Sequence, residues 1–357
     1  MTAAAPLSRT APADAARVLI VEDSAVARAV IGRVIDDSAR FAVAGAVTDA
    51  GAALRFLATN TVDYILLDIH LPGVDGITAL PDLLAAGGDA KVLIVSSAAA
   101  DGATQTVQAL ALGAADTLVK PQTGALSARF GEALLEKLDR LAEPAAPSAP
   151  PPQPTTQFEP RAIADAYDVV AIGASTGGIH ALSRLLRELP QGFRVPILVT
   201  QHLPITFMPY FAAQIALLAG RPCEVATDRL RVRPGRVVVA PGDAHMCVVP
   251  LADGTAGIRL SRTPSPTGCM PAVDPMLASV AACHGARAMA VVLSGMGRDG
   301  AEGARAIRDA GGAVVVQDQE SSVIWGMPGA VAAQGLADAM LPPDEIGRLL
   351  AARRRPA

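Results

Sequence analysis

Short, almost wholly apolar runs alternate with helical patterns along this chain, and this alternation limits the fold more than any other feature. In the first 141 residues, five such runs are predicted to be strands: RVLIVED, AVAGAV, YILLDI, KVLIVSS and DTLVK. Helical patterns lie between them, such as Ala25 to Asp36 and Asp49 to Ala58. Because near-continuous apolar strands need cover on both faces, the pattern predicts a parallel sheet between two layers of helices.

The same alternation returns in the second half of the chain. Four further runs are predicted to be strands: DVVAIGAS, VPILVTQH, RAMAVVLSG and GAVVVQD. The segment HMCVVPLADGTAGIRLS differs, because two strand-like runs flank Asp253 and Gly254, which indicates a β-hairpin. The fold class is therefore predicted to be α/β, with two doubly wound parallel-sheet domains and a small antiparallel hairpin in the second.

A proline-rich segment separates the two halves. Residues 143–160 read EPAAPSAPPPQPTTQFEP and offer no periodic apolar face, which is typical of an extended, semi-rigid spacer. The first residues, MTAAAPLSRTAPADAA, are expected to form a disordered extension. We therefore divide the chain into an extension at 1–16, a first domain at 17–141, a linker at 142–164 and a second domain at 165–357.

Charge and composition argue against several classes of protein. The formal net charge is −4 and no basic helix-turn-helix pattern is present, so nucleic acid is not expected as a partner. No apolar run approaches the roughly 18 to 20 residues that span a bilayer, and the N-terminus lacks the apolar core of a signal peptide. The four scattered cysteines form no C-x-x-C pair, which argues against a zinc site or a disulfide framework. Buried thiols in a reducing cytoplasm are expected instead.

Polar residues end the strands of the first domain. Glu22 and Asp23 follow the first strand, Asp68 ends the third, Ser96 the fourth and Lys120 the fifth. The carboxyl ends of parallel strands share one edge, where three carboxylates would repel one another unless a cation such as Mg²⁺ bound. The hydroxyl and the ammonium would suit the oxygens of an acyl phosphate. The alternative is that Asp68 caps a helix and Lys120 is solvated.

These residues resemble those of a response-regulator receiver domain, which has a flavodoxin-like fold. The resemblance covers Arg17 to Leu141 and rests on VEDS, LLDIHLPGVDG, the hydroxyl in VLIVSS, and LVKP. It implies that Asp68 accepts a phosphoryl group from a histidine kinase. The implied Mg²⁺ ligands are Glu22, Asp23, Asp68 and the backbone carbonyl of His70. One position departs from the family, because Thr117 stands where receivers usually carry an aromatic switch residue.

The stretch VVAIGASTGG in the second domain has two interpretations. A dinucleotide loop would need G-x-G-x-x-G followed by an acidic strand end, but the glycines here are Gly173, Gly177 and Gly178, and the next strand ends in Gln201–His202. The same stretch also contains G-x-S-x-G, the frame of a nucleophile turn around Ser175. The spacing favours the serine.

A nucleophilic serine needs a base and an acid that orients the base. Among the five histidines, His202 ends the strand that follows Ser175, which places both residues at one sheet edge. The other histidines are less suitable by position; they are His70, His180, His245 and His284. Asp299 follows the strand AVVLSG, and its alternative role is to cap the helix predicted at 301–310. Gly295 and Gly297 leave backbone N–H groups free to face an oxyanion.

The second domain resembles the catalytic domain of chemotaxis protein-glutamate methylesterases, the CheB family, which is Rossmann-like. The resemblance covers Tyr167 to about Leu341 and rests on IGASTGG, VTQHLP, APGDAHM, VVLSGMGRDGAEG and QDQESSVIWGMP. It implies a triad of Ser175, His202 and Asp299, with the Met296 backbone N–H binding the oxyanion.

The resemblance also implies a function. A receiver-regulated hydrolase of this family removes methyl groups from glutamate methyl esters on chemoreceptors, releases methanol and deamidates receptor glutamines. Hydrolysis would need no cofactor, and Mg²⁺ would serve the receiver alone. Two alternatives stay open: a receiver-regulated esterase with another substrate in a pathway outside chemotaxis, and a binding module without catalysis.

Overall fold

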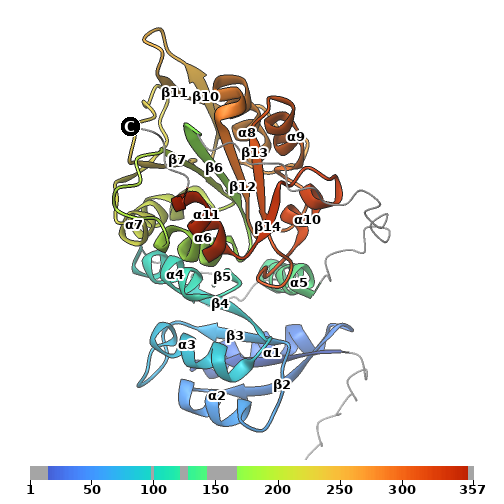
Figure 1. Cartoon of the computed structure of the whole chain (residues 1–357). Helices are drawn as coiled ribbons and strands as arrows, with labels where there is room; N and C mark the ends of the chain where they lie inside the picture. The colour runs from blue at the N-terminus through green and yellow to red at the C-terminus, as the bar shows by residue number, and fades with distance from the viewer. Residues whose placement is uncertain (1–14, 98–99, 121–127, 143–166, 353–357) are drawn as a thin grey trace, which may run out of the picture. The chain divides into compact units, whose positions relative to one another are not determined.

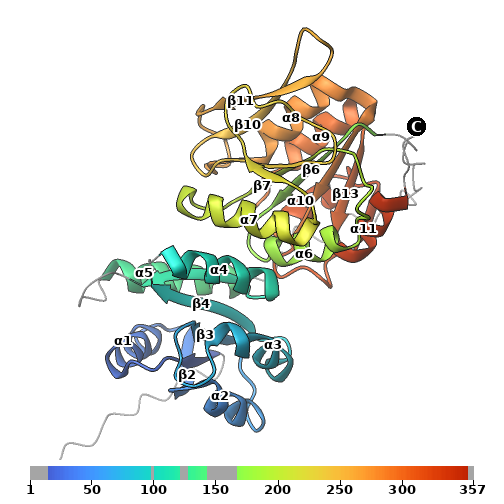
Figure 2. The same ribbon diagram turned by 90° about the vertical axis from the view of Figure 1, so that its left-hand side faces the viewer.

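The computed structural model describes residues 15–97, 100–120, 128–142 and 167–352, which form two compact units (Figures 1 and 2). The predicted N-terminal extension and the proline-rich linker lie almost wholly outside the described residues. No helix in the described ranges combines the length and the apolar character needed to cross a bilayer.

The first unit contains a five-stranded parallel sheet in the order β2-β1-β3-β4-β5, as the apolar runs predict. Its strands are β1 (Ala16–Val21), β2 (Phe41–Val47), β3 (Tyr64–Asp68), β4 (Lys91–Ser97) and β5 (Asp116–Lys120). Its helices are α1 (Ala25–Asp36), α2 (Ala50–Leu57), α3 (Gly76–Gly87) and α5 (Ala128–Ala142). Helix α4 (Ala100–Leu112) joins β4 to β5, but its residues 103–112 are grouped with the second unit. Figure 2 shows α1 and α5 on one face of the sheet and α2 and α3 on the other.

Short polar side chains start the helices of this unit close to the strand ends. The Ser24 hydroxyl accepts a hydrogen bond from the Ala27 N–H at the start of α1 (3.3 Å). Asp49 accepts one from the Ala52 N–H at the start of α2 (2.8 Å). Because such caps satisfy amide groups that have no partner inside the helix, β1 and β2 are each followed by a sharply defined helix start.

The second unit is built on a seven-stranded parallel sheet in the order β14-β13-β12-β6-β7-β9-β8. Its strands are β6 (Val169–Ala174), β7 (Ile197–Gln201), β8 (Cys223–Val225), β9 (Val237–Val239), β12 (Ala288–Val292), β13 (Ala313–Gln317) and β14 (Ala339–Leu341). The predicted hairpin is confirmed as β10 (His245–Pro250) and β11 (Ala256–Ser261), with Gly254 in the left-handed region at φ 78°. The three-residue strands β8, β9 and β14 were not predicted.

Helices cover both faces of this sheet (Figure 1). They are α6 (Gly178–Arg187), α7 (Met208–Ala219), α8 (Val273–His284), α9 (Ala301–Asp309), α10 (Gly326–Ala333) and α11 (Pro343–Ala352), with two 3₁₀ turns at Ile205–Phe207 and Gly285–Arg287. Helix α8 packs on α9 and on the hairpin strand β10, whereas α11 packs on α6. A Cβ at Gly303 would lie 2.6 Å from the Leu277 Cβ, so the close approach of α8 and α9 depends on this glycine.

The order of the strands decides where a site can form in the second unit. Strand β6 lies between β12 and β7, so the chain leaves β6 toward one side of the sheet and returns later on the other. In open parallel sheets this reversal opens a crevice at the carboxyl ends of the strands. The residues that follow β6, β7 and β12 therefore meet at one edge.

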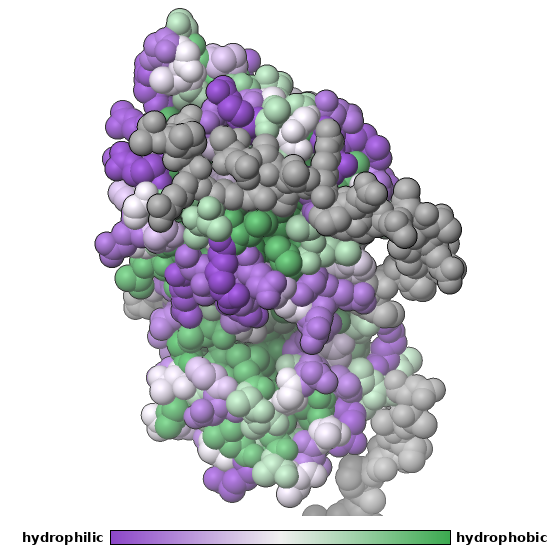
Figure 3. Space-filling model, viewed as in Figure 1, coloured by the Kyte–Doolittle hydropathy of each residue, from purple (hydrophilic) through white to green (hydrophobic). Residues whose placement is uncertain are grey.

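On the face drawn in Figure 3, green hydrophobic areas alternate with purple hydrophilic ones. Within the described ranges the large exposed apolar side chains are scattered along the chain; they are Val26, Val74, Val119, Ile205, Leu217, Met270 and Met340. Isolated residues of this kind are normal on a folded protein.

Candidate functional site

The predicted acidic cluster forms at the carboxyl edge of the first sheet. Ligand oxygens of Glu22, Asp23 and Asp68 all lie within 4.8 Å of one another. The Lys120 Nζ reaches into the cluster, 2.6 Å from the Glu22 Oε2 and 2.8 Å from the Asp68 Oδ2. Lys120 is thus paired and not solvated, and Asp68 lies in the cluster instead of capping a helix.

Charge is only partly balanced in this cluster. Burial raises the pKa of Glu22, although Lys120 acts in the opposite direction. Burial also acts to lower the pKa of Lys120, but hydrogen bonds and charges from Asp68 and Glu22 outweigh it and raise that pKa. Three carboxylates against one ammonium leave excess negative charge, so the residues present fit a hard divalent cation with oxygen ligands.

The other predicted receiver residues lie at or near the ends of β3, β4 and β5. Ser96 is buried near the end of β4. The His70 N–H donates to the Asp68 Oδ1 (3.2 Å), while the His70 side chain is exposed. Thr117 pairs with Ile94 in the first half of β5, three residues before the lysine at the strand end.

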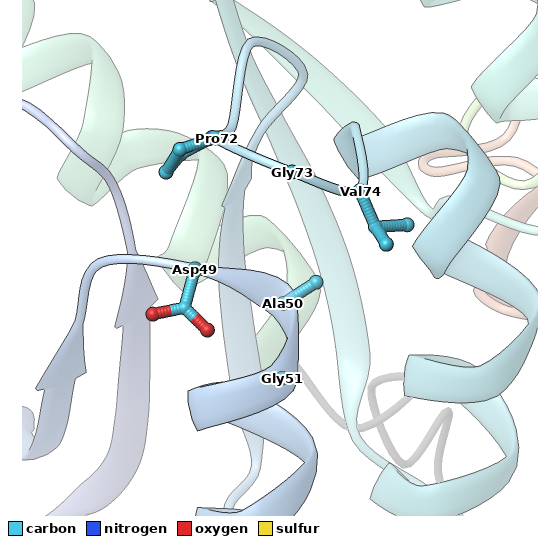
Figure 4. A pocket seen from close by; sticks show the side chains of 6 residues that line it. All are labelled: Asp49, Ala50, Gly51, Pro72, Gly73 and Val74. Atoms are coloured by element: carbon cyan, nitrogen blue, oxygen red, sulfur yellow. The ribbon is translucent and has the colours of Figure 1, made fainter.

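A surface pocket in the same unit does not belong to this cluster. It is lined by Asp49, Ala50, Gly51, Pro72, Gly73 and Val74 (Figure 4). Its titratable side chain is Asp49, whose carboxylate caps α2; the Ala52 N–H is the main cause of the lowered pKa of this carboxyl. The pocket offers no nucleophile or base.

Ser175 occupies the turn between β6 and α6, and neighbouring strands hold its backbone in place. Its N–H donates to the Ser294 carbonyl (3.0 Å), and its own carbonyl accepts from the Gly178 N–H (2.8 Å) and the Gln201 Nε2 (2.9 Å). Gly177 adopts φ 75°, a conformation that disfavours other residues. Ser175 itself is partly exposed at the sheet edge.

His202 continues β7 beside the serine. Its N–H donates to the carbonyl of Ala174, the residue before Ser175 (3.1 Å). Its Nε2 lies 2.8 Å from the Asp299 Oδ2. Because an ionised carboxylate can only accept, Nε2 carries the hydrogen, and Nδ1 is left as the proton acceptor of the neutral ring.

Asp299 is buried and held by two further backbone donors. Its Oδ2 accepts from the Val273 N–H (2.7 Å), and its Oδ1 accepts from the Asp274 N–H (3.1 Å). The capping alternative for Asp299 is wrong, because the Asp274 Oδ1 accepts from the N–H groups of Gly300 (2.9 Å) and Gly303 (2.7 Å) at the start of α9. A carboxylate from α8 therefore caps α9 and leaves Asp299 free to face the histidine.

The pKa values at this edge follow from burial and from these contacts. Burial acts to lower the pKa of His202, but hydrogen bonds and charges from Asp299 and Cys269 outweigh it and raise the pKa to about 9. Burial acts to raise the pKa of Asp299, yet hydrogen bonds from His202 and Val273 outweigh it and hold that pKa below the usual range. Burial, together with the charge of Asp299, raises the pKa of Asp274 to about 6.

The segment after β12 runs close to the serine. A Cβ at Gly295 would lie 2.8 Å from the Ser175 Cβ, so no larger residue fits there. The Gly295 N–H donates to the Ile324 carbonyl (3.0 Å). Among the residues that the structure describes, no acceptor engages the Met296 N–H. This donor is available at the edge of the site.

Two residues outside the predicted set are placed at or near this edge. The Cys269 Sγ lies within 4.8 Å of a ring nitrogen of His202, a proximity that no spacing rule in the sequence signals. His245 is buried and structural, since its Nδ1 accepts from the Ala272 N–H (2.8 Å) and its Nε2 lies 2.8 Å from the Thr263 carbonyl oxygen. The expectation of buried thiols is wrong, because all four cysteines are partly exposed.

Comparison with known proteins agrees with this architecture. A family model described as CheB methylesterase matches residues 170–350, and one described as response regulator receiver domain matches residues 18–129. The protein-glutamate methylesterase/protein-glutamine glutaminase 2 of Caulobacter vibrioides is 41% identical over 344 residues, which cover 95% of this chain and 99% of that protein.

Further relatives and a solved structure extend the match. A protein-glutamate methylesterase/protein-glutamine glutaminase 1 of Paramagnetospirillum magneticum is 39% identical, covering 96% of this chain and 97% of its own length. The crystal structure of the Thermotoga maritima CheB methylesterase catalytic domain is 35% identical, with a TM-score of 0.51, and covers 52% of this chain and 98% of that domain. This chain, with a receiver domain before its hydrolase domain, belongs to the CheB methylesterase family.

Proposed function

We propose that this protein is a phosphorylation-regulated serine hydrolase that demethylates glutamate methyl esters on chemoreceptors and deamidates specific receptor glutamines. The observation that carries the catalytic part is the 2.8 Å contact between His202 Nε2 and Asp299 Oδ2. His202 lies beside the Ser175 turn, since its N–H donates to the carbonyl of Ala174. The substrate class is supported by the relatives in Caulobacter vibrioides and Paramagnetospirillum magneticum, which are protein-glutamate methylesterase/protein-glutamine glutaminases and match nearly the whole chain.

The residues at this edge suffice for acyl transfer. Ser175 is the nucleophile: as its Oγ attacks the γ-carbonyl carbon, the hydroxyl proton passes to His202 Nδ1. Asp299 stabilises the imidazolium through Nε2–H. The tetrahedral oxyanion takes a hydrogen bond from the Met296 N–H. Collapse breaks the ester C–O bond, and the methoxide leaves as methanol with the proton from Nδ1.

Water completes the cycle by the same route. It gives a proton to Nδ1, attacks the acyl-enzyme, and its oxygen remains in the glutamate carboxylate while Ser175 recovers its hydrogen. With a glutamine side chain the first leaving group is ammonia and the second half is unchanged. Each step assigns proton transfer and charge stabilisation to this chain's own groups, so hydrolysis requires no cofactor.

The receiver supplies the control. Asp68 is the phosphoryl acceptor, and a histidine kinase of the chemotaxis type is the donor. Mg²⁺ would be held by Glu22, Asp23, Asp68 and the backbone carbonyl of His70, where it would offset the charge of the incoming phosphoryl group. Ser96 and Lys120 would bind the phosphoryl oxygens.

The proposed organisation places the receiver at 17–141 and the catalytic domain at 165–357, joined by a linker at 142–164 and preceded by a disordered extension at 1–16. The partners are methyl-accepting receptors and the kinase, with no role for nucleic acid or membrane insertion. A cytoplasmic location follows from these partners, since receptor methylation sites and kinases of this type work there.

Methanol release from methylated receptor fragments tests the proposal. The wild-type chain should release one methanol per ester hydrolysed, and Ser175→Ala should release none above background. Hydrolysis of small esters without action on receptor fragments would point to a different substrate. Absence of any hydrolysis, with binding of receptor fragments retained, would point to a binding module.

A further inference from the structure

A second group of metal-binding side chains lies at the catalytic edge. One ligand atom each from His202, Cys269 and Asp299 lies within 4.8 Å of the others. His202 and Cys269 are partly buried and Asp299 is buried, so the group opens toward solvent on one side. Among the described residues, the other such group is the acidic cluster of the receiver.

The geometry points to an inhibitory site for a thiophilic divalent cation, Zn²⁺ above all, formed by His202, Cys269 and Asp299. A nitrogen, a sulfur and a carboxylate oxygen are the donor set that Zn²⁺ prefers, with three protein ligands and one open position. Three ligand atoms that all lie within 4.8 Å of one another can share one ion through bonds of about 2.0 to 2.3 Å once the side chains adjust. Mg²⁺ disfavours such ligands.

The thiol is placed for this role by its surroundings. The Cys269 Sγ lies within 4.8 Å of both a ring nitrogen of His202 and a carboxylate oxygen of Asp299. The Sγ also lies 3.8 Å from the Thr267 carbonyl oxygen. The three remaining cysteines have raised pKa values, chiefly because of burial.

Backbone contacts hold the ligands near one another before any ion arrives. The segment that carries Cys269 is anchored a few residues later, where the Ala272 N–H donates to His245 and the Val273 N–H donates to Asp299. Asp299 is oriented further by the Asp274 N–H. Such outer contacts fix ligand orientation in metal sites.

Occupancy would stop catalysis whichever ring nitrogen binds the ion. If Nε2 binds, its hydrogen must move to Nδ1, and the acceptor that Ser175 needs is lost. If Nδ1 binds, its lone pair is taken directly. In both cases the Cys269 thiol proton is released to solvent, and no oxidation or reduction takes place.

Zinc inhibition of the full chain tests this site, in buffers that hold free Zn²⁺ fixed and contain excess Mg²⁺ to fill the receiver. Each variant is compared with its own zinc-free rate of methanol release. Wild type should be inhibited, and Cys269→Ser and Cys269→Ala should need at least about tenfold more free Zn²⁺ for the same inhibition. Cys247→Ser, which changes a partly exposed cysteine outside the group, should behave as wild type.

Co²⁺ binding gives a readout that does not depend on esterase activity. The wild-type chain and Cys247→Ser should show thiolate-to-cobalt charge-transfer absorption, and Cys269→Ser should lack it. Equal zinc inhibition of wild type and Cys269→Ser, or cobalt absorption that survives in Cys269→Ser, would overturn the site. The inhibition rests on the proposed function but the cobalt signal does not, so failure of the esterase and failure of the site are distinguishable.

Discussion

The receiver and the catalytic domain both gather polar side chains at the carboxyl edge of a parallel sheet, but they put different atoms there. The receiver edge combines oxygens of Glu22, Asp23 and Asp68 with one ammonium, that of Lys120. The catalytic edge combines a hydroxyl, an imidazole, a carboxylate and a thiol. The sheet supplies the location, and the residues that end its strands decide the chemistry.

The two edges also balance charge differently. In the receiver, burial and the charge of Asp68 act to raise the pKa of Glu22, and one ammonium faces three carboxylates. In the catalytic domain the charge of Asp299 is matched by His202 and by two backbone donors, Val273 and Asp274. The proposed function therefore asks different things of the two edges: the first would bind an ion and a phosphoryl group, and the second would transfer protons.

Removing the nucleophile or the base should have the largest effect, because it should abolish hydrolysis at the catalytic edge and leave phosphorylation at the receiver edge unchanged. Ser175→Ala and His202→Ala should each lower the turnover number for methanol release by a factor on the order of 10⁴ to 10⁶, because serine and base act as a unit. Asp299→Asn should retain about tenfold more activity than either. Phosphorylation of Asp68 should be unaffected in all three. Near-normal turnover in Ser175→Ala would rule out the serine mechanism.

Asp274 tests whether the catalytic edge is arranged in advance. Asp274→Ala leaves the Gly300 and Gly303 amides without their acceptor and should displace Asp299, lowering kcat/KM by a factor on the order of 10². It should also cost about 1 to 3 kcal/mol in the free energy of unfolding. Asp274→Asn keeps the accepting oxygen and should lose far less on both counts. Equal losses in the two variants would assign the effect to charge and not to capping.

The pH dependence of hydrolysis reports the state of His202. The base must be neutral, and the raised pKa of about 9 means that the rate should climb with pH toward that value, by about tenfold per unit below it. Asp299→Asn removes a main cause of the raised pKa of His202. The range over which the rate increases with pH should therefore move to lower pH. A rate already at its plateau at pH 7 would contradict a pKa of 9 in the working enzyme.

The same shift affects stability in a defined direction. Because the folded pKa of His202 lies above the ordinary value of 6.5, the protonated ring stabilises the fold fully below that value. This contribution is lost as the pH rises through about 9. Urea unfolding of wild type and His202→Ala across this window should show the difference narrowing at high pH.

Much of this fold was predictable, because long apolar strands separated by helices have few alternatives. The sheets, the hairpin and α1 agree with the pattern, and the comparisons confirm the family. The strands β8, β9 and β14 were missed, since three residues are too few to show a period. The domain boundaries and the roles of the site residues remain predictions.

The parts of the site that the sequence did not reveal depend on contacts between distant segments. Asp274 caps α9 from α8, and its sequence neighbours give no sign of that. Cys269 reaches His202 across 67 positions of chain, with no motif linking them. Sequence motifs for metal ligands rely on short spacings between residues of one helix, strand or loop. Here His202, Cys269 and Asp299 each come from a different strand end or loop.

Control by the receiver is the smallest expected effect and the sharpest test of the division between the two edges. With phosphodonor present, the wild-type chain should release methanol about tenfold faster, the change that a bias of about 1.4 kcal/mol produces. Asp68→Asn should stay at the basal rate, and so should wild type after chelation of divalent cations, because phosphorylation needs the ion at the acidic edge.

Chelation should not lower the basal rate itself, since the hydrolytic steps use only side chains and backbone of the second domain. If chelation abolished basal hydrolysis and zinc restored it, the cation at His202 would be a catalytic requirement and not an inhibitor, and the two edges would be alike in depending on a metal.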